Sequence, residues 1–208
     1  MINGAMSCGS VLFKWFCDFF CKDLVEEKGS VSNAYETMDE MASLSGPGAG
    51  GLLLLPYFNG ERSPVFDSSA RGVFFGMGLG STRSDFIRAI MESVGYGLRQ
   101  LLEIEESLLG TRIENILVAG GATKDSLWMQ ILSDIMERSL VISKVTDTGA
   151  LGAAILSGIS AGIIDRKFCA QHKLEGEKFH PNSKLSGLYT EKYLKYVKLY
   201  PAVKDLYG

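Results

Sequence analysis

The sequence predicts an α/β protein, in which short buried strands alternate with helices in packed layers. Short apolar runs bounded by glycine or proline are typical of buried strands, and they cover 52–56, 72–76, 116–119 and 140–142. A long helical recurrence of apolar residues runs from 84 to 109. In the second half, each strand-like run is followed by a helical pattern, which is the alternation that this fold class requires.

Composition limits the class of protein. The 208 residues suffice for one substantial core, and 46% apolar with 22% charged residues describes a globular chain. A net charge of −3 without a long basic run argues against nucleic-acid or anionic-membrane partners. We find neither an apolar run of ~18 residues nor a signal-peptide pattern. The four cysteines, with only His172 and His180, make a poor metal set, so reduced thiols and the cytoplasm are favoured.

The first elements are predicted to be helical. Apolar positions recurring over 11–25 predict one helix that Gly29 ends, and a second helix is expected over 32–41. The glycines of 46–51 indicate a turn. The first two strands follow, joined by an irregular loop between Pro56 and Pro64.

The long helix is predicted from its two ends. Thr82 or Ser84 can cap its start, and Gly110 stands at its C-terminal stop. Its interior holds Gly95 and Gly97, each of which costs about 1 kcal/mol relative to alanine in an exposed helix. We therefore expect a neighbouring element to pack closely at both glycines.

The stretch 116–131 carries the strongest local signal for binding. Its apolar run is broken by Gly120 and Gly121, and an amphipathic helical pattern follows at once. Glycine allows positive φ and the close approach of a ligand, and a helix start presents free N–H groups and the positive end of its dipole. A nucleotide-binding turn and an ordinary strand-to-helix turn are equally good interpretations of these residues alone.

The remaining pattern predicts two more helices. Small residues over 149–158 predict a helix that lies close to a neighbour or a ligand and is too short to span a bilayer. The tyrosine- and lysine-rich segment 188–206 predicts a helix on the outside of the molecule.

Four stretches, taken in order, carry a family resemblance. They are Leu52–Pro64 with Leu-Pro-Tyr-Phe-Asn-Gly-Glu-Arg-Ser-Pro; Gly72, Phe74, Gly76, Met77, Asp85, Phe86, Ala89, Ile90, Met91 and Glu92; Gly120 and Gly121 with Trp128, Gln130 and Asp134; and Ala150–Ala154. Together they resemble the C-terminal domain of the FGGY carbohydrate kinases, most closely the xylulose kinase branch. The resemblance covers nearly the whole chain and weakens after about Asp165.

This resemblance implies a ribonuclease H-like fold of the actin and hexokinase type, lacking its first strands. Residues 1–208 would form the C-terminal nucleotide-binding domain of a two-domain sugar kinase, with 166–208 as a helical tail packed on it. The implied cofactors are ATP and Mg²⁺, and the implied reaction moves the γ-phosphoryl of ATP to a sugar hydroxyl. D-xylulose is the first candidate; gluconate, ribulose, glycerol or a non-catalytic nucleotide-binding or interaction module remain open.

The resemblance places the catalytic aspartate, most sugar ligands and the phosphate-binding hairpin in segments that precede Met1. No catalytic or metal-ligating residue is therefore predicted here. We expect the 208-residue chain alone to make no phosphorylated sugar, and detecting that product with purified chain would refute this. Absence of the first strands would leave an open sheet edge, so we also expect a homo-oligomer or a partner covering it.

The cofactor-binding candidates are Gly120, Gly121, Ala122, Asp125, Ser10 and Lys14. Gly121 and Asp125 align with a glycine and an asparagine or serine that contact adenosine in the family, and Ala122 replaces a third glycine. A carboxylate at Asp125 repels phosphate, so it suits the ribose or the adenine amino group, unless it is a simple N-cap. Ser10 and Lys14 resemble a pair that faces the nucleotide; Lys14 could reach a phosphate oxygen or be merely solvated.

Four other positions are interpreted as structural. For Glu61 and Arg62 a structural ion pair at the cleft is expected, although an arginine fork also suits an anion or an interdomain carboxylate. Asp147 is expected to cap the small-residue helix or to support the site indirectly. Trp128 is expected in the core rather than against a ligand.

Overall fold

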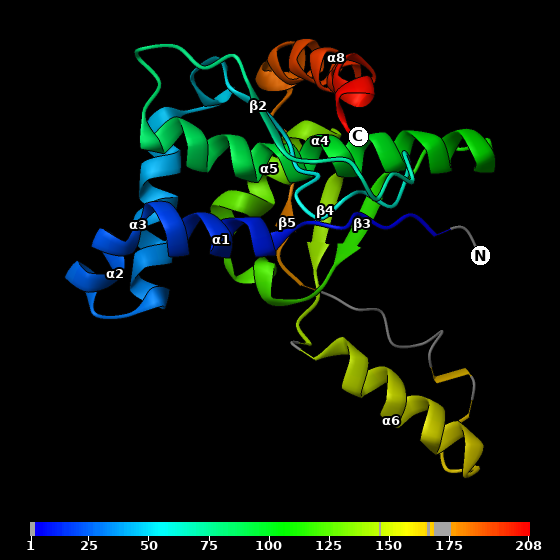
Figure 1. The fold of residues 1–208 in the computed structure, drawn as a ribbon. Helices are drawn as coiled ribbons and strands as arrows, with labels where there is room; N and C mark the ends of the chain where they lie inside the picture. Colours follow the sequence, from blue (N-terminus) through cyan, green and yellow to red (C-terminus); the bar gives the residue numbers. More distant parts are fainter. Residues whose placement is uncertain (1–2, 146, 166, 169–175) are drawn as a thin grey trace.

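The computed structural model describes residues 3–145, 147–165, 167–168 and 176–208. Cys169 and His172 lie outside the described residues. Figure 1 shows α4 (Arg83–Leu109) running through the molecule, with α8 (Ser186–Val203) on one side and strands β3, β4 and β5 on the other. Helix α4 packs against α3 (Val31–Ser45) and α5 (Ser126–Met136), and α8 packs against β1 and α5.

Two small sheets organise the strands. Strand β1 (Leu53–Leu55) is fully buried and pairs antiparallel with β2 (Val73–Phe75). In the second sheet, β3 (Asn115–Val118) runs parallel to β4 (Ser139–Ile142), and β5 (Lys178–Phe179) pairs antiparallel with β4. Among the described strands, β3 therefore has a neighbour on one side only, as an open sheet edge requires.

Helix α4 confirms the expectations drawn from its ends and its glycines. Thr82 caps it through a reciprocal capping box with Asp85, and Gly110 adopts the left-handed conformation at its end. A Cβ on Gly95 would lie 2.8 Å from the Ile135 side chain, and one on Gly97 would clash with Met6. Neighbouring side chains therefore pack closely at both glycines, as expected.

The single helix predicted over 11–25 is wrong. The structure has two helices, α1 (Ser10–Phe20) and α2 (Lys22–Lys28), separated at Cys21, whose backbone is not helical (φ −132°, ψ 28°). The break turns the chain so that α2 packs against α3. A continuous helix would have carried α2 along the direction of α1, so tertiary packing overrides the apolar period here.

Helix α6 (Thr148–Ser160) stands apart from the rest. Figure 1 shows it projecting away from the sheets, and none of its thirteen residues is buried. The side chain of Asp147 accepts a hydrogen bond from the Ala150 N–H at 2.8 Å, which confirms the expected cap. By contrast, α8 buries Tyr189, Tyr193, Tyr196 and Leu199 against the body.

A buried ion pair within α4 is hydrogen-bonded to a tyrosine of α8. The Arg88 guanidinium donates to the Glu92 carboxylate at 2.9 Å and to the Tyr189 hydroxyl at 2.8 Å. Glu92 also accepts hydrogen bonds from the Gly48 N–H at 2.8 Å and from the Tyr96 hydroxyl at 3.2 Å. Because every charge is paired and hydrogen-bonded, this network is tolerated in the core.

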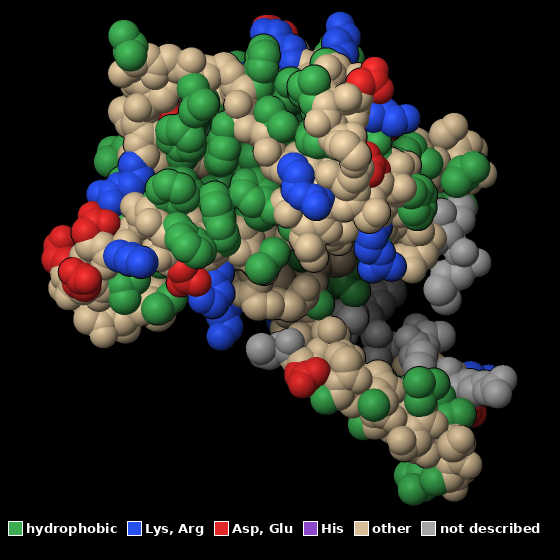
Figure 2. All heavy atoms as spheres, viewed as in Figure 1, with side chains coloured by type: hydrophobic (Ala, Val, Ile, Leu, Met, Phe, Trp, Pro, Cys, Tyr) green, Lys and Arg blue, Asp and Glu red, His purple; other side chains and the backbone are tan. Residues whose placement is uncertain are grey.

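The molecular surface carries an apolar area on one face. Figure 2 shows hydrophobic side chains gathered over α1 and the segment near β2, and Phe19, Phe20, Phe75 and Met77 are all more than half exposed. In the described part of the chain, no helix is both long and apolar enough to cross a membrane. The three described cysteines, Cys8, Cys17 and Cys21, are buried free thiols.

Candidate functional site

The glycine turn after β3 differs from the expected strand-to-helix junction. Gly120 has φ 111°, a conformation that favours glycine, and the chain then forms a 3-10 turn, η2 (Gly121–Lys124), before α5 begins. The Asp125 carboxylate caps α5 by accepting from the Trp128 N–H at 2.8 Å. The helix therefore does not start at the glycines, and this N–H is already occupied.

A cavity of about 440 Å³ opens beside this turn. Helices α1 and α3 supply two of its walls, and the η2 turn with the start of α5 supplies the third. Its size lies within the range of small-molecule sites. The residues that line it are Ser10, Phe13, Ser32, Tyr35, Glu36, Asp39, Gly121, Ala122, Lys124, Asp125 and Trp128.

Aromatic rings form the apolar wall of the cavity. The ring centroids of Phe13 and Tyr35 lie 5.3 Å apart, and those of Phe13 and Trp128 lie 5.6 Å apart. The Trp128 indole donates to the Met91 carbonyl at 3.1 Å, which fixes its orientation. Trp128 is thus buried in the core, as expected, and it also lines the cavity. An aromatic wall of this kind suits a flat ring system as a ligand.

Four of the six candidate residues line this one cavity: Ser10, Gly121, Ala122 and Asp125. Gly120 lies directly before them but is not part of the lining. Lys14 does not line it either; its ammonium group is paired with Asp18 one turn along α1, and 61% of its side chain is exposed. Asp18 raises the pKa of Lys14.

Sequence reasoning missed the contribution of α3. Tyr35, Glu36 and Asp39 come from a helix far from the glycine turn in the sequence, and no local motif marks them. Burial and the nearby Asp125 carboxyl raise the pKa of Asp39 to about 7. Burial also raises the pKa of Asp125, against the lowering effect of the Trp128 N–H. Because three carboxyl groups and one ammonium group line the cavity, it suits hydrogen-bond donors rather than phosphate.

Glu61 and Arg62 do not form an ion pair with each other. The buried Glu61 carboxylate accepts instead from the Ser7 N–H at 2.6 Å and from the Arg62 N–H at 2.7 Å. Within the described ranges, neither side chain makes an ion pair, and Arg62 is exposed. Glu61 turns inward because it holds the N-terminal segment against the loop.

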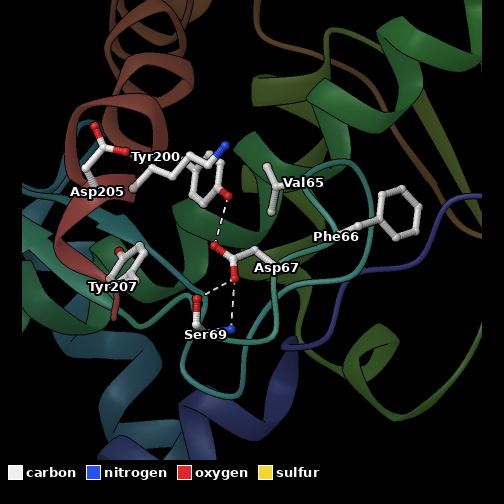
Figure 3. Close-up of a pocket in the computed structure, with 8 residues that line it drawn as sticks. Val65, Phe66, Asp67, Ser69, Tyr200, Asp205 and Tyr207 are labelled. Carbon is white, nitrogen blue, oxygen red and sulfur yellow. Dashed lines mark hydrogen bonds between the residues drawn. The ribbon is translucent and has the colours of Figure 1, made fainter.

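A second cavity, of about 520 Å³, is shown in Figure 3. Its central carboxylate, Asp67, accepts from the Tyr200 hydroxyl at 2.9 Å and from the Ser69 N–H and hydroxyl at 2.8 and 2.7 Å. Those bonds hold the pKa of Asp67 below its usual value. The hydrogen-bond acceptors of this carboxylate are therefore already occupied by groups of the protein. The bond from Tyr200 attaches the loop to α8, and Lys204–Leu206 (η4) lies beside it.

The chain is similar to known proteins along most of its length. Residues 1–161 match the FGGY family of carbohydrate kinases, C-terminal domain. The gluconokinase of Bacillus subtilis (strain 168) is 30% identical over 166 residues, which are 79% of this chain and 32% of that protein. The chain therefore spans about a third of the length of this relative.

Two solved structures extend the comparison. The crystal structure of xylulose kinase from Rhodospirillum rubrum superposes with a TM-score of 0.82 at 25% identity, covering 98% of this chain and 40% of that one. The crystal structure of Plasmodium falciparum glycerol kinase with ADP gives a TM-score of 0.71 at 25% identity, covering 91% of this chain and 36% of that one.

Proposed function

This chain belongs to the FGGY family of carbohydrate kinases as a C-terminal, actin-like ATPase domain, and we propose that the cavity beside Gly121 receives the adenosine of ATP. The observation that carries the proposal is the meeting of Ser10, Gly121, Ala122 and Asp125 around one aromatic-walled cavity. A solved relative holds ADP, which supports a nucleotide as the ligand.

The chemistry of the cavity supports one orientation of the nucleotide. Phe13, Tyr35 and Trp128 offer apolar ring surfaces to a base. Asp125 offers oxygen acceptors to its amino group or to the ribose hydroxyls, and its carboxylate and that of Glu36 repel phosphates. The base and ribose would therefore enter the cavity, and the phosphates would extend away from it.

Magnesium is proposed on family grounds alone. Among the described residues, no group of three His, Cys, Asp or Glu side chains could hold a metal ion. We assign no residue of this chain to Mg²⁺ and no step of the reaction to it.

The whole enzyme is proposed to transfer the γ-phosphoryl of ATP to a sugar hydroxyl, with D-xylulose as the first candidate sugar. The R. rubrum xylulose kinase supports that candidate, while the gluconokinase and glycerol kinase relatives support gluconate and glycerol as alternatives, and ribulose also stays open. The buried free thiols support a cytoplasmic location. The single-sided β3 edge supports a homo-oligomer or a covering partner.

A non-catalytic nucleotide-binding or interaction module is the alternative of another class. Titration calorimetry with ATP separates the two in part: absence of heat at millimolar nucleotide would favour a module that has lost nucleotide binding. Restoration of turnover by an added N-terminal half would favour the kinase.

Replacing Gly121 by valine should weaken nucleotide binding at least about tenfold, equivalent to ~1.4 kcal/mol, without unfolding the chain. A Cβ on Gly121 would meet no atom within 4 Å, because it would project into open space beside the cavity. Calorimetric titration with ADP measures the loss. Gly80→Val is the matched control, since a Cβ there also meets no atom within 4 Å and Gly80 does not line the cavity. Equal affinity in both variants would contradict the assignment.

A further inference from the structure

Two carboxyl groups from distant parts of the chain meet in the wall of the cavity. Asp39 comes from α3 and Asp125 from the start of α5, and both line the cavity. The Oδ1 atom of Asp39 is buried, and no described N–H or O–H group donates to it. Each carboxyl group perturbs the pKa of the other, so the two side chains lie close enough to share a proton. An unpaired buried oxygen therefore becomes satisfied by a shared proton.

The surrounding groups decide which carboxyl keeps the proton. Asp125 accepts from the Trp128 N–H, and the Leu127 N–H also stabilises its ionised form. Asp39 has no such backbone donor, and Glu36 on the same helix adds a further negative charge beside it. The proton therefore lies on Asp39, whose O–H donates to the ionised Asp125. Lys124, next to Asp125 in the chain, is a cation among the residues that line the cavity.

We propose that Asp39 is a positioning residue for nucleoside binding: by sharing one proton with Asp125 it holds the Asp125 carboxylate against a hydrogen-bond donor of the bound nucleoside. This inference rests on the proposed function of the cavity and extends it to a residue that no motif marks. The donor on the ligand is either the exocyclic amino group of the base or a ribose hydroxyl.

The arrangement makes binding depend on pH. When the shared proton leaves, two adjacent carboxylates repel each other and Asp125 loses the O–H that orients it. A base covering the cavity would also remove the water that stabilises two neighbouring charges. Both effects oppose binding, so affinity should fall as the pH rises through about 7, where the proton of Asp39 is lost.

The test measures the dissociation constant of adenosine by calorimetry between pH 5.5 and 8.5, using the full 208-residue chain. Adenosine is the probe because it carries no phosphate whose own titration would interfere. The affinity of the unmodified chain should fall at least about fivefold from pH 6 to pH 8.5. Asp39→Asn should keep the higher affinity throughout, since its amide donates to Asp125 without a titrating proton. Glu40→Gln, on an exposed neighbouring side chain, should follow the unmodified profile.

Three outcomes would overturn the proposal. A flat profile in the unmodified chain does so without relying on any variant. An Asp39→Asn profile equal to that of the unmodified chain also does so. If neither adenosine nor ADP binds at any pH, the proposed function fails and this inference fails with it. If ADP binds but the affinity for adenosine does not change with pH, only this inference fails.

Two further ligands identify the donor. Inosine replaces the amino group by a carbonyl oxygen, and 2′-deoxyadenosine lacks one ribose hydroxyl. Weakened binding of inosine supports the amino group as the donor, and weakened binding of 2′-deoxyadenosine supports the ribose. If both bind as adenosine does, the Asp125 carboxylate contacts neither the amino group nor the 2′-hydroxyl, and equal binding of 3′-deoxyadenosine as well would exclude the ribose diol and overturn the proposal.

Discussion

Replacing Arg88 by leucine should lower the free energy of unfolding by about 3–5 kcal/mol, the usual loss when one partner of a buried ion pair is removed. The side chains of Arg88 and Glu92 are 5% and 1% exposed, and Glu92 would remain buried without its cation. Tyr189 on α8 would also lose the guanidinium that donates to it, so the contact between α4 and α8 should loosen. Urea denaturation followed by circular dichroism measures the change.

Arg112→Leu is the matched control for this experiment. Arg112 pairs with Glu114 at 3.0 Å, yet both side chains are more than half exposed. Exposed pairs contribute about 0–1 kcal/mol, so the same substitution there should change little. If the free energy of unfolding falls equally in the two variants, burial does not determine how much the Arg88–Glu92 pair contributes to stability.

Replacing Asp39 by asparagine should stabilise the fold at pH 8, to a smaller degree at pH 5, and have little effect only below about pH 4. The pKa of Asp39 is raised from 3.8 to about 7 in the folded chain, so between these values the folded state keeps a proton that the unfolded state releases. The unmodified chain therefore loses stability as the pH rises from about 4 to 7, and the loss is complete above pH 7. Asparagine does not titrate, so the variant escapes this loss.

The full shift would correspond to at most about 4 kcal/mol, at 1.36 kcal/mol per pKa unit. Water in the open cavity screens part of the repulsion, so we expect a gain of about 1–2 kcal/mol at pH 8. Urea denaturation of both proteins at pH 5 and pH 8 measures it, with Glu40→Gln as the control. A variant less stable than the unmodified chain at pH 8 would show that loss of the Asp39 proton does not destabilise the fold.

The sequence alone determined those parts of the structure that depend on neighbours within a few residues. The Thr82 cap, the Gly110 stop and the Asp147 cap are hydrogen-bonded or conformational features of one helix end, so their residue types predict them. The short apolar runs also predicted β1 to β4, because a buried strand needs apolar side chains and breakers at its ends. The glycine turn likewise predicted a region that lines a cavity, which includes Gly121, Ala122 and Asp125.

Only the tertiary structure decided how distant segments meet. The break at Cys21 follows from packing of α2 on α3, and the inward turn of Glu61 follows from the position of Ser7. The pairing of Asp39 with Asp125 depends on α3 and α5 both packing against α4. No propensity or motif encodes such a meeting, because its free energy comes from burial between elements that share no local sequence.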